Sequence, residues 1–154
     1  MKIQKKQAGF TLIELITVVS MLALLTIFVA REMGQSSDDI KKNLVVTALV
    51  SSFPAAIASF KGANFGNCVA SGTDITLTDL AARGVPLNSP WGVAWTFSYA
   101  PLTRDITITY SVSGANDAIG MVTSLVSILA NNAAFEGEPA VGTDTTTIVV
   151  VYSC

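Results

Sequence analysis

Residues 10–30 read FTLIELITVVSMLALLTIFVA, and this stretch decides how the whole chain is organised. It contains one charged residue, Glu14, and neither proline nor glycine interrupts it. As a helix it would be about 30 Å long, which matches the hydrocarbon core of a bilayer. The sequence therefore predicts a membrane-spanning helix over residues 10–30.

The residues before this segment predict its orientation. Lys2, Lys5 and Lys6 precede it, and basic residues stay on the cytoplasmic side of a membrane. We therefore expect the chain after residue 30 to lie outside the cytoplasm. If residues 1–9 are removed, the nine basic residues less these three leave six against eleven acidic ones, a net charge of −5.

Simple interpretations of the segment account for it poorly. A removable secretory signal has a shorter apolar run ending in small residues, whereas Phe28 and Val29 place bulky residues before Ala30. A plain membrane anchor fits the length, but an ionised carboxylate in an apolar helix costs about 2.5–3.5 kcal/mol on insertion scales. Either Glu14 lies in contact with water at the edge of the bilayer, or it has a charged partner.

Residues 5–14, KKQAGFTLIE, resemble the leader junction of type IV prepilins. The resemblance implies cleavage between Gly9 and Phe10 by a membrane prepilin peptidase, followed by methylation of the new amino group of Phe10. It also implies that Glu14 pairs with the N-terminal amine of a neighbouring subunit during assembly. Because Phe10 and Glu14 are four residues apart, they share one face of the helix.

The helix is expected to continue beyond the membrane as an amphipathic half. Its apolar residues recur at intervals of three and four, the spacing of one helical face against a core. Pro54 should bend or break this helix, and Gly62 is the expected C-cap. The apolar stripe consists of Val46, Leu49, Phe53, Ile57 and Phe60.

The predicted fold class is α+β, with a long N-terminal helical spine packed on a small antiparallel-leaning sheet, as in type IV pilins. We expect a cleaved leader over residues 1–9, the long helix over 10–62 and a globular head over 63–154. Within the head, the patterns predict a surface loop (63–74), a short helix (78–83), two hairpin strands (94–99 and 105–112), an amphipathic helix capped by Asn116 or Asp117 (118–132) and a strand inside the sheet (145–152).

The order of these elements, and the turn NSPWG at residues 88–92, resemble the head of type IVb pilins. For Trp91 and Trp95 we expect packing in the core or in the turn. The alternative is a surface adhesive patch.

The two cysteines, Cys68 and Cys154, both lie on the exported side of the apolar segment. An oxidising compartment would permit a disulfide between them. It would close a loop of about 86 residues and stabilise the fold by roughly 4–5 kcal/mol in the chain-entropy model. Two unpaired buried thiols are the alternative.

The composition disfavours catalysis and nucleic-acid binding. There is no histidine, no CxxC pair and no glycine-rich nucleotide motif, so we expect no enzyme, no cofactor and no metal. Glu136, Glu138 and Asp144 could form a calcium site on a loop, but solvated charge is the simpler explanation. No basic stripe remains after residue 9 to follow phosphates.

The predicted function is that of a structural subunit of a type IV pilus for adhesion, motility or uptake. Its expected partners are identical or related pilins, a prepilin peptidase, an inner-membrane assembly platform and the membrane itself before assembly. The precursor would lie in the inner membrane and the product in an extracellular filament. One alternative is a pseudopilin of a type II secretion or DNA-uptake system. Another is an anchored binding or sensory module that keeps residues 1–9 and never polymerises.

Overall fold

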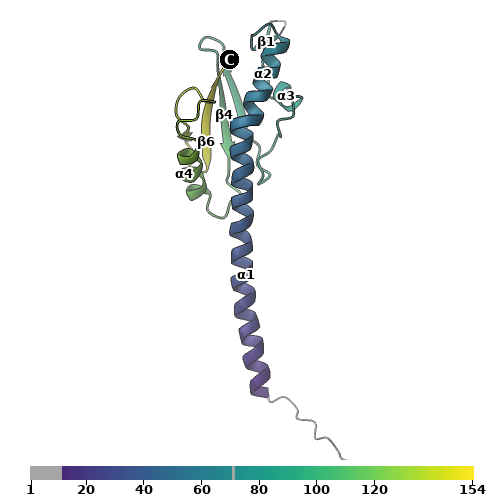
Figure 1. Ribbon diagram of the computed structural model, residues 1–154, viewed down its shortest axis with the longest axis vertical. Helices are drawn as coiled ribbons and strands as arrows, with labels where there is room; N and C mark the ends of the chain where they lie inside the picture. Colours follow the sequence, from purple (N-terminus) through teal and green to yellow (C-terminus); the bar gives the residue numbers. More distant parts are fainter. Residues whose placement is uncertain (1–11, 71) are drawn as a thin grey trace, which may run out of the picture. The chain divides into compact units, whose positions relative to one another are not determined.

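The computed structural model describes residues 12–70 and 72–154. The chain forms two compact units, Met1–Ser37 and Asp38–Cys154, which we describe separately. Helix α1 (Leu12–Thr47) begins in the first unit and ends in the second. Figure 1 shows the elements along the chain.

The described part of the first unit belongs to α1, which is apolar as far as Ala30. Its segment Leu12–Ala30 has a mean hydropathy of 2.5, and none of it is buried within the chain. Three hydroxyl groups donate to main-chain carbonyl oxygens three or four residues earlier, so they need no partner outside the helix. These bonds run from Thr17 to Glu14 at 2.9 Å, from Ser20 to Ile16 at 2.8 Å and from Thr26 to Leu22 at 2.7 Å.

In the second unit, Asp38–Cys154, which we call the head from here on, the break expected at Pro54 is a π-helical turn immediately before that residue. The turn η1 (Ala48–Ser52) joins α1 to α2 (Phe53–Ala63), and the amide of Phe53 donates to the carbonyl of Ala48, five residues earlier. In this register the carbonyl of Leu49 would face the nitrogen of Pro54, which carries no hydrogen. Instead, the hydroxyl of Tyr152 donates to the Leu49 carbonyl at 2.7 Å.

The prediction that Gly62 caps this helix is wrong. Helix α2 continues to Ala63, where the side-chain amide of Asn64 donates to the carbonyl of Phe60 at 2.8 Å. The amide of Gly66 then donates to the carbonyl of Lys61 at 2.8 Å. Gly66 has a φ of 82°, a left-handed conformation that favours glycine, so the reversal occurs four residues later than predicted.

The head contains a four-stranded antiparallel sheet in the order β3-β4-β6-β5. The predicted hairpin is present, and the last long strand lies inside the sheet as expected. The strands are β3 (Thr96–Ala100), β4 (Asp105–Ser111), β6 (Thr147–Ser153) and the short edge strand β5 (Ala140–Val141).

Part of the segment expected to be a loop, residues 63–74, is instead a small hairpin. Its strands β1 (Val69–Ala70) and β2 (Thr73–Asp74) pair with each other and not with the larger sheet. Two-residue strands leave too few alternating positions to be recognised from the sequence. The same reason explains why β5 was not predicted.

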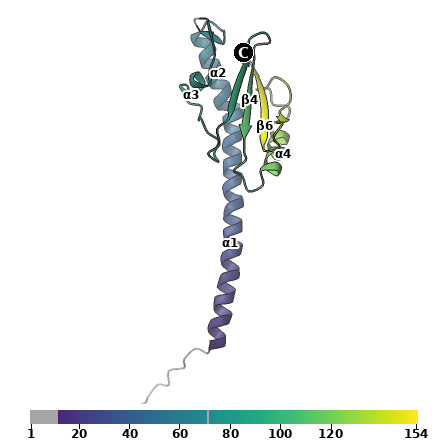
Figure 2. The same ribbon diagram turned by 180° about the vertical axis from the view of Figure 1, so that it is seen from behind.

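Two short helices complete the head. Helix α3 (Leu77–Ala81) begins with a capping box between Thr76 and Asp79. Helix α4 (Ala118–Leu129) is capped by Asp117, whose carboxylate accepts from the amide of Gly120 at 3.0 Å. Within the second unit, Figures 1 and 2 both place β4 and β6 between α4 and the helical run formed by the end of α1 and by α2.

The core of the head forms where one face of the sheet meets the helices. Phe53 is fully buried, and its ring centroid lies 4.8 Å from Trp95, 6.2 Å from Tyr152 and 6.3 Å from Tyr110. Alternate residues of β4 and β6 are buried on the sheet face that carries Tyr110 and Tyr152, including Ile108 at 0% and Val150 at 1% exposure. The chain is therefore α+β, with an arrangement consistent with a type IV pilin-like fold.

Candidate processing and assembly site

The predicted processing site lies outside the described residues. Gly9 and Phe10 both precede Leu12, where the description begins. Cleavage between them and methylation of Phe10 therefore remain predictions. Glu14 is the nearest predicted site residue that the structure describes, and it lies in the first turn of α1.

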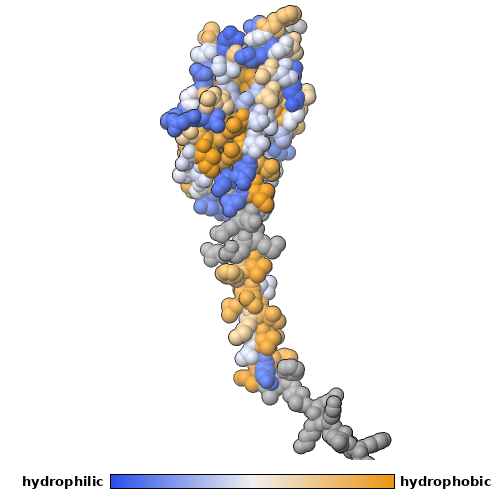
Figure 3. All heavy atoms as spheres, in the orientation of Figure 1, coloured by the Kyte–Doolittle hydropathy of each residue, from blue (hydrophilic) through white to orange (hydrophobic). Residues whose placement is uncertain are grey.

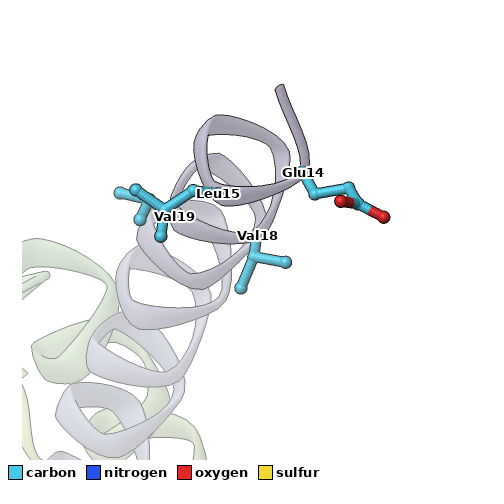
Figure 4. Close-up of a pocket in the computed structure, with 4 residues that line it drawn as sticks. All are labelled: Glu14, Leu15, Val18 and Val19. Carbon is cyan, nitrogen blue, oxygen red and sulfur yellow. The ribbon is translucent and has the colours of Figure 1, made fainter. Parts of the chain in front are cut away.

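Glu14 combines a carboxylate with an apolar helix surface. Figure 4 shows its side chain projecting away from those of Leu15 and Val19. Leu15, Val18 and Val19 expose 62%, 54% and 58% of their surfaces, so the described residues leave more than half of each side chain uncovered. A negative group near the N-terminus of a helix is favoured by the helix dipole. One turn of helix therefore offers both a charge and a broad apolar contact surface.

The exposed apolar surface continues along the helix as far as Val29. Large apolar side chains from Leu12 to Val29 expose between 52% and 78% of their surfaces. In Figure 3 the apolar colour dominates the visible part of this helix, whereas polar and apolar colours alternate over the head. A contiguous apolar surface of this extent is a site for contact with lipid or with other proteins.

The second predicted site is the pair of cysteines, and the structure joins them in a disulfide. The Cα atoms of Cys68 and Cys154 are 6.0 Å apart, although the residues are 86 positions apart in the sequence. Both are buried, with exposures of 1% and 6%. The bond ties the segment after α2 to the end of β6.

Sequence reasoning did not identify Asp38 as an important residue. Its carboxylate is only 9% exposed and accepts from the amide of Asn116 at 2.9 Å and from the indole of Trp91 at 2.9 Å. A third bond comes from the side-chain amide of Asn116 at 2.9 Å. These donors, the Asn116 main chain first, hold the pKa of Asp38 below its usual value. Asp38 thus connects α1 to two loops of the head.

The two tryptophans are used in packing. Trp95 is 2% exposed, and its indole donates to the carbonyl of Pro86 at 2.6 Å. Trp91 is partly covered, and its indole is engaged with Asp38 while Lys41 lies 5.8 Å from the ring centroid. These contacts agree with the packing interpretation and leave little of either residue for an adhesive patch.

Other candidate sites in the head are weak. Over residues 12–70 and 72–154, no group of three histidine, cysteine or acidic side chains is placed to hold a metal ion. The Asp144 carboxylate accepts from the amide and the hydroxyl of Thr146, at 3.1 and 2.9 Å. A groove between Pro54 and Ala134 has a volume of about 130 Å³. Ligand pockets are usually about 300–1,000 Å³, so this groove is small for a ligand.

Comparison with known proteins identifies the N-terminal segment. Residues 4–30 match the family model of the prokaryotic N-terminal methylation motif, a range that includes Gly9, Phe10 and Glu14. No curated protein and no solved structure matches the chain. The match ends at residue 30, so it describes the leader and the apolar helix and leaves the head to be judged from its structure. Residues 4–30 of this chain therefore carry the signature of type IV prepilin-like proteins.

Proposed function

We propose that the chain is a structural subunit of a type IV pilus. A membrane prepilin peptidase removes residues 1–9, and the new amino group of Phe10 is methylated. The apolar helix leaves the membrane through an inner-membrane assembly platform and bundles with the helices of identical or related subunits. The head, residues 63–154 together with the helix that packs on it, then lies on the outside of an extracellular filament.

The observation that supports this proposal most strongly is the methylation motif on an uncovered apolar helix. A helix of 19 residues without internal cover requires either lipid or neighbouring helices. The methylation motif at the start of this helix favours a protein whose helix lies first in lipid and then among neighbouring helices. The intramolecular bonds of Thr17, Ser20 and Thr26 suit both, because these hydroxyls need no water.

Glu14 would give the assembly its register. In a bundle of apolar helices, side-chain packing alone permits helices to slide past each other. A carboxylate that pairs with the N-terminal amine of a neighbour fixes their relative height, because a displaced pair leaves two charges in an apolar surrounding. The role of Glu14 is therefore specificity of docking more than stability of the fibre.

A pseudopilin of a type II secretion or DNA-uptake system is the alternative within the same class. It would have the same leader, helix and processing, but it would assemble as part of a secretion or DNA-uptake system. The terminal disulfide, the acidic exported part and the type IVb-like order of elements in the head favour the pilus. The type IVb subgroup itself stays a prediction.

A non-polymerising anchored module is the alternative from another class, and processing separates it from the pilin. The first experiment is the intact mass and N-terminal sequence of the protein from native membranes and sheared surface fibres. We expect a chain that begins at N-methylated Phe10. A chain that retains Met1, or one cut near Ala30, would contradict the proposal. Gly9→Val should block processing, whereas Gln7→Ala in the same leader should not.

Assembly is tested separately with Glu14→Gln, which removes the charge and keeps the shape. We expect normal cleavage at Phe10 and a loss of sheared filaments of at least tenfold, measured by immunoblot of the surface fraction. Glu138→Gln removes a carboxylate from the head and serves as the matched control, with filament levels unchanged. Normal filaments from Glu14→Gln would refute the role of Glu14 but leave the processing result untouched.

A further inference from the structure

Three segments of the head meet where the disulfide forms. The segment after α2 carries Cys68, the end of β6 carries Cys154, and the connection from β3 to β4 carries Arg104. Figures 1 and 2 show the C-terminal end of β6 at the same end of the head as the C-terminal end of α2. The contacts of Arg104 link all three segments.

Arg104 holds both main-chain polar groups of Cys154. The carbonyl of Arg104 accepts from the amide of Cys154 at 2.8 Å, and its Nη2 donates to the carbonyl of Cys154 at 3.0 Å. These two bonds fix the backbone of Cys154 against the β3–β4 connection. Neither involves a sulfur atom, so both are compatible with the reduced chain.

The same guanidinium group reaches the segment that carries the other cysteine. Nη2 of Arg104 also donates to the carbonyl of Gly66 at 3.3 Å, two residues before Cys68. Gly66 is itself tied to α2 through its bond to Lys61. Arg104 therefore bridges the two ends of the loop that the disulfide closes.

The backbone of Arg104 gives a second, independent observation. Its φ is 65°, in the left-handed region, and its amide donates to the carbonyl of Ala100 at 2.8 Å to close the turn. Glycine adopts this conformation without the cost of roughly 1–2 kcal/mol that other residues bear. The turn alone would favour glycine, so the guanidinium contacts are what an arginine adds at this position.

We propose that Arg104 is a positioning residue for formation of the Cys68–Cys154 disulfide. It holds Cys154 beside the segment of Cys68 before the sulfur atoms join, and so raises the effective concentration of one thiol at the other. This inference does not depend on the proposed function, because it concerns folding of the head and requires no filament.

The chemical step is thiol–disulfide exchange, with oxidised glutathione as the oxidant in the test. One cysteine thiolate attacks a glutathione sulfur, forms a mixed disulfide and releases one glutathione thiolate. The second cysteine thiolate attacks the protein sulfur of that mixed disulfide and releases the second glutathione. The cysteines lose two protons and two electrons, and the electrons reduce the glutathione disulfide. Arg104 acts on the second, intramolecular attack.

The test measures the thiol–disulfide equilibrium of the full chain in detergent micelles. The reduced protein is equilibrated with mixtures of reduced and oxidised glutathione, trapped by alkylation and counted by intact mass. We expect Arg104→Ala to lower the effective concentration of the thiol pair by about three- to tenfold. Arg104→Lys should give an intermediate value, because both bonds come from the one nitrogen Nη2, and an ammonium on a flexible stem holds its donors less firmly than a planar guanidinium.

Arg83→Ala is the matched control. Arg83 also donates to a main-chain carbonyl, that of Asp79 at 2.9 Å, and its guanidinium lies 4.8 Å from the ring centroid of Phe60, but neither contact links the two cysteine segments. We expect the effective concentration of the thiol pair in Arg83→Ala to stay within twofold of that in the parent chain. Equal effective concentrations of the thiol pair in the parent, Arg104→Lys and Arg104→Ala would overturn the proposal, even if Arg104→Ala lowers thermal stability. If Arg104→Ala does not fold, an unchanged equilibrium for Arg104→Lys overturns it.

Discussion

The N-terminal helical unit and the head differ in what covers their apolar side chains. Between Leu12 and Val29 the large apolar residues are more than half exposed, whereas Leu49, Leu80 and Ile106 in the head are fully buried. The head therefore carries the stabilising energy of the folded monomer. The apolar surface of the helix remains available to stabilise contacts with lipid or with other subunits.

The largest effect is expected from replacing one phenylalanine in the buried core of the head, in comparison with one on the exposed apolar helix. Phe53→Ala removes the ring at the centre of the head core and should lower the free energy of unfolding by about 3–5 kcal/mol. The measurement is urea unfolding of the full chain in micelles, followed by tryptophan fluorescence, since Trp95 lies against Phe53. Phe28→Ala, at a position 66% exposed, should leave this transition unchanged. Similar losses from both variants would break the comparison.

A smaller effect is expected at Asp38, which joins α1 to the loops of the head. Asp38→Asn should cost about 1.5–3 kcal/mol at pH 7, because three donors lose a charged acceptor. The neighbouring variant Asp39→Asn should cost less than about 0.5 kcal/mol, since the carboxylate of Asp39 forms an exposed ion pair with Lys42. Equal costs for the two variants would contradict this account.

The contribution of Asp38 to the free energy of unfolding should also depend on pH. Its pKa in the folded chain lies below the usual 3.8, so the carboxylate stabilises the fold above the pKa of the unfolded chain. This stabilisation is lost as the pH falls through the folded-state pKa. The difference in unfolding free energy between the parent and Asp38→Asn should therefore be full at pH 6 and shrink below about pH 4. A difference that does not change with pH would refute the role of the charge.

The smallest effect concerns the π-helical turn before Pro54. Tyr152→Phe leaves the carbonyl of Leu49 without its hydroxyl donor and should cost about 1–2 kcal/mol. Tyr99→Phe on the partly buried strand β3 is the control, and it should change the stability by less than about 0.5 kcal/mol. The combination Tyr152→Phe with Pro54→Ala should recover part of the loss, because alanine restores an amide hydrogen to the helix. No recovery would contradict the link between Pro54 and Tyr152.

Most of the fold could be predicted from local patterns. Periods of three to four residues revealed α2 and α4, alternation revealed β4, an apolar run revealed β6, and the residues around Gly9 revealed the prepilin-like signature. The contacts that organise the head could not be predicted in this way. The bonds of Asp38 span 53 and 78 residues, and the bond of Tyr152 to Leu49 spans 103. No short window of sequence contains both partners of such a bond.

The position of β6 also has a consequence for the order of events during export. This strand spans Thr147–Ser153, lies between β4 and β5, and places the ring of Tyr152 against Phe53. In this sheet β5 pairs with β6, and β6 also pairs with one edge of β4. In a head that emerges from a translocation channel with its N-terminal end first, the sheet thus cannot close until β6 has passed. Subunits halted before β6 has passed would expose open strand edges for quality control to detect.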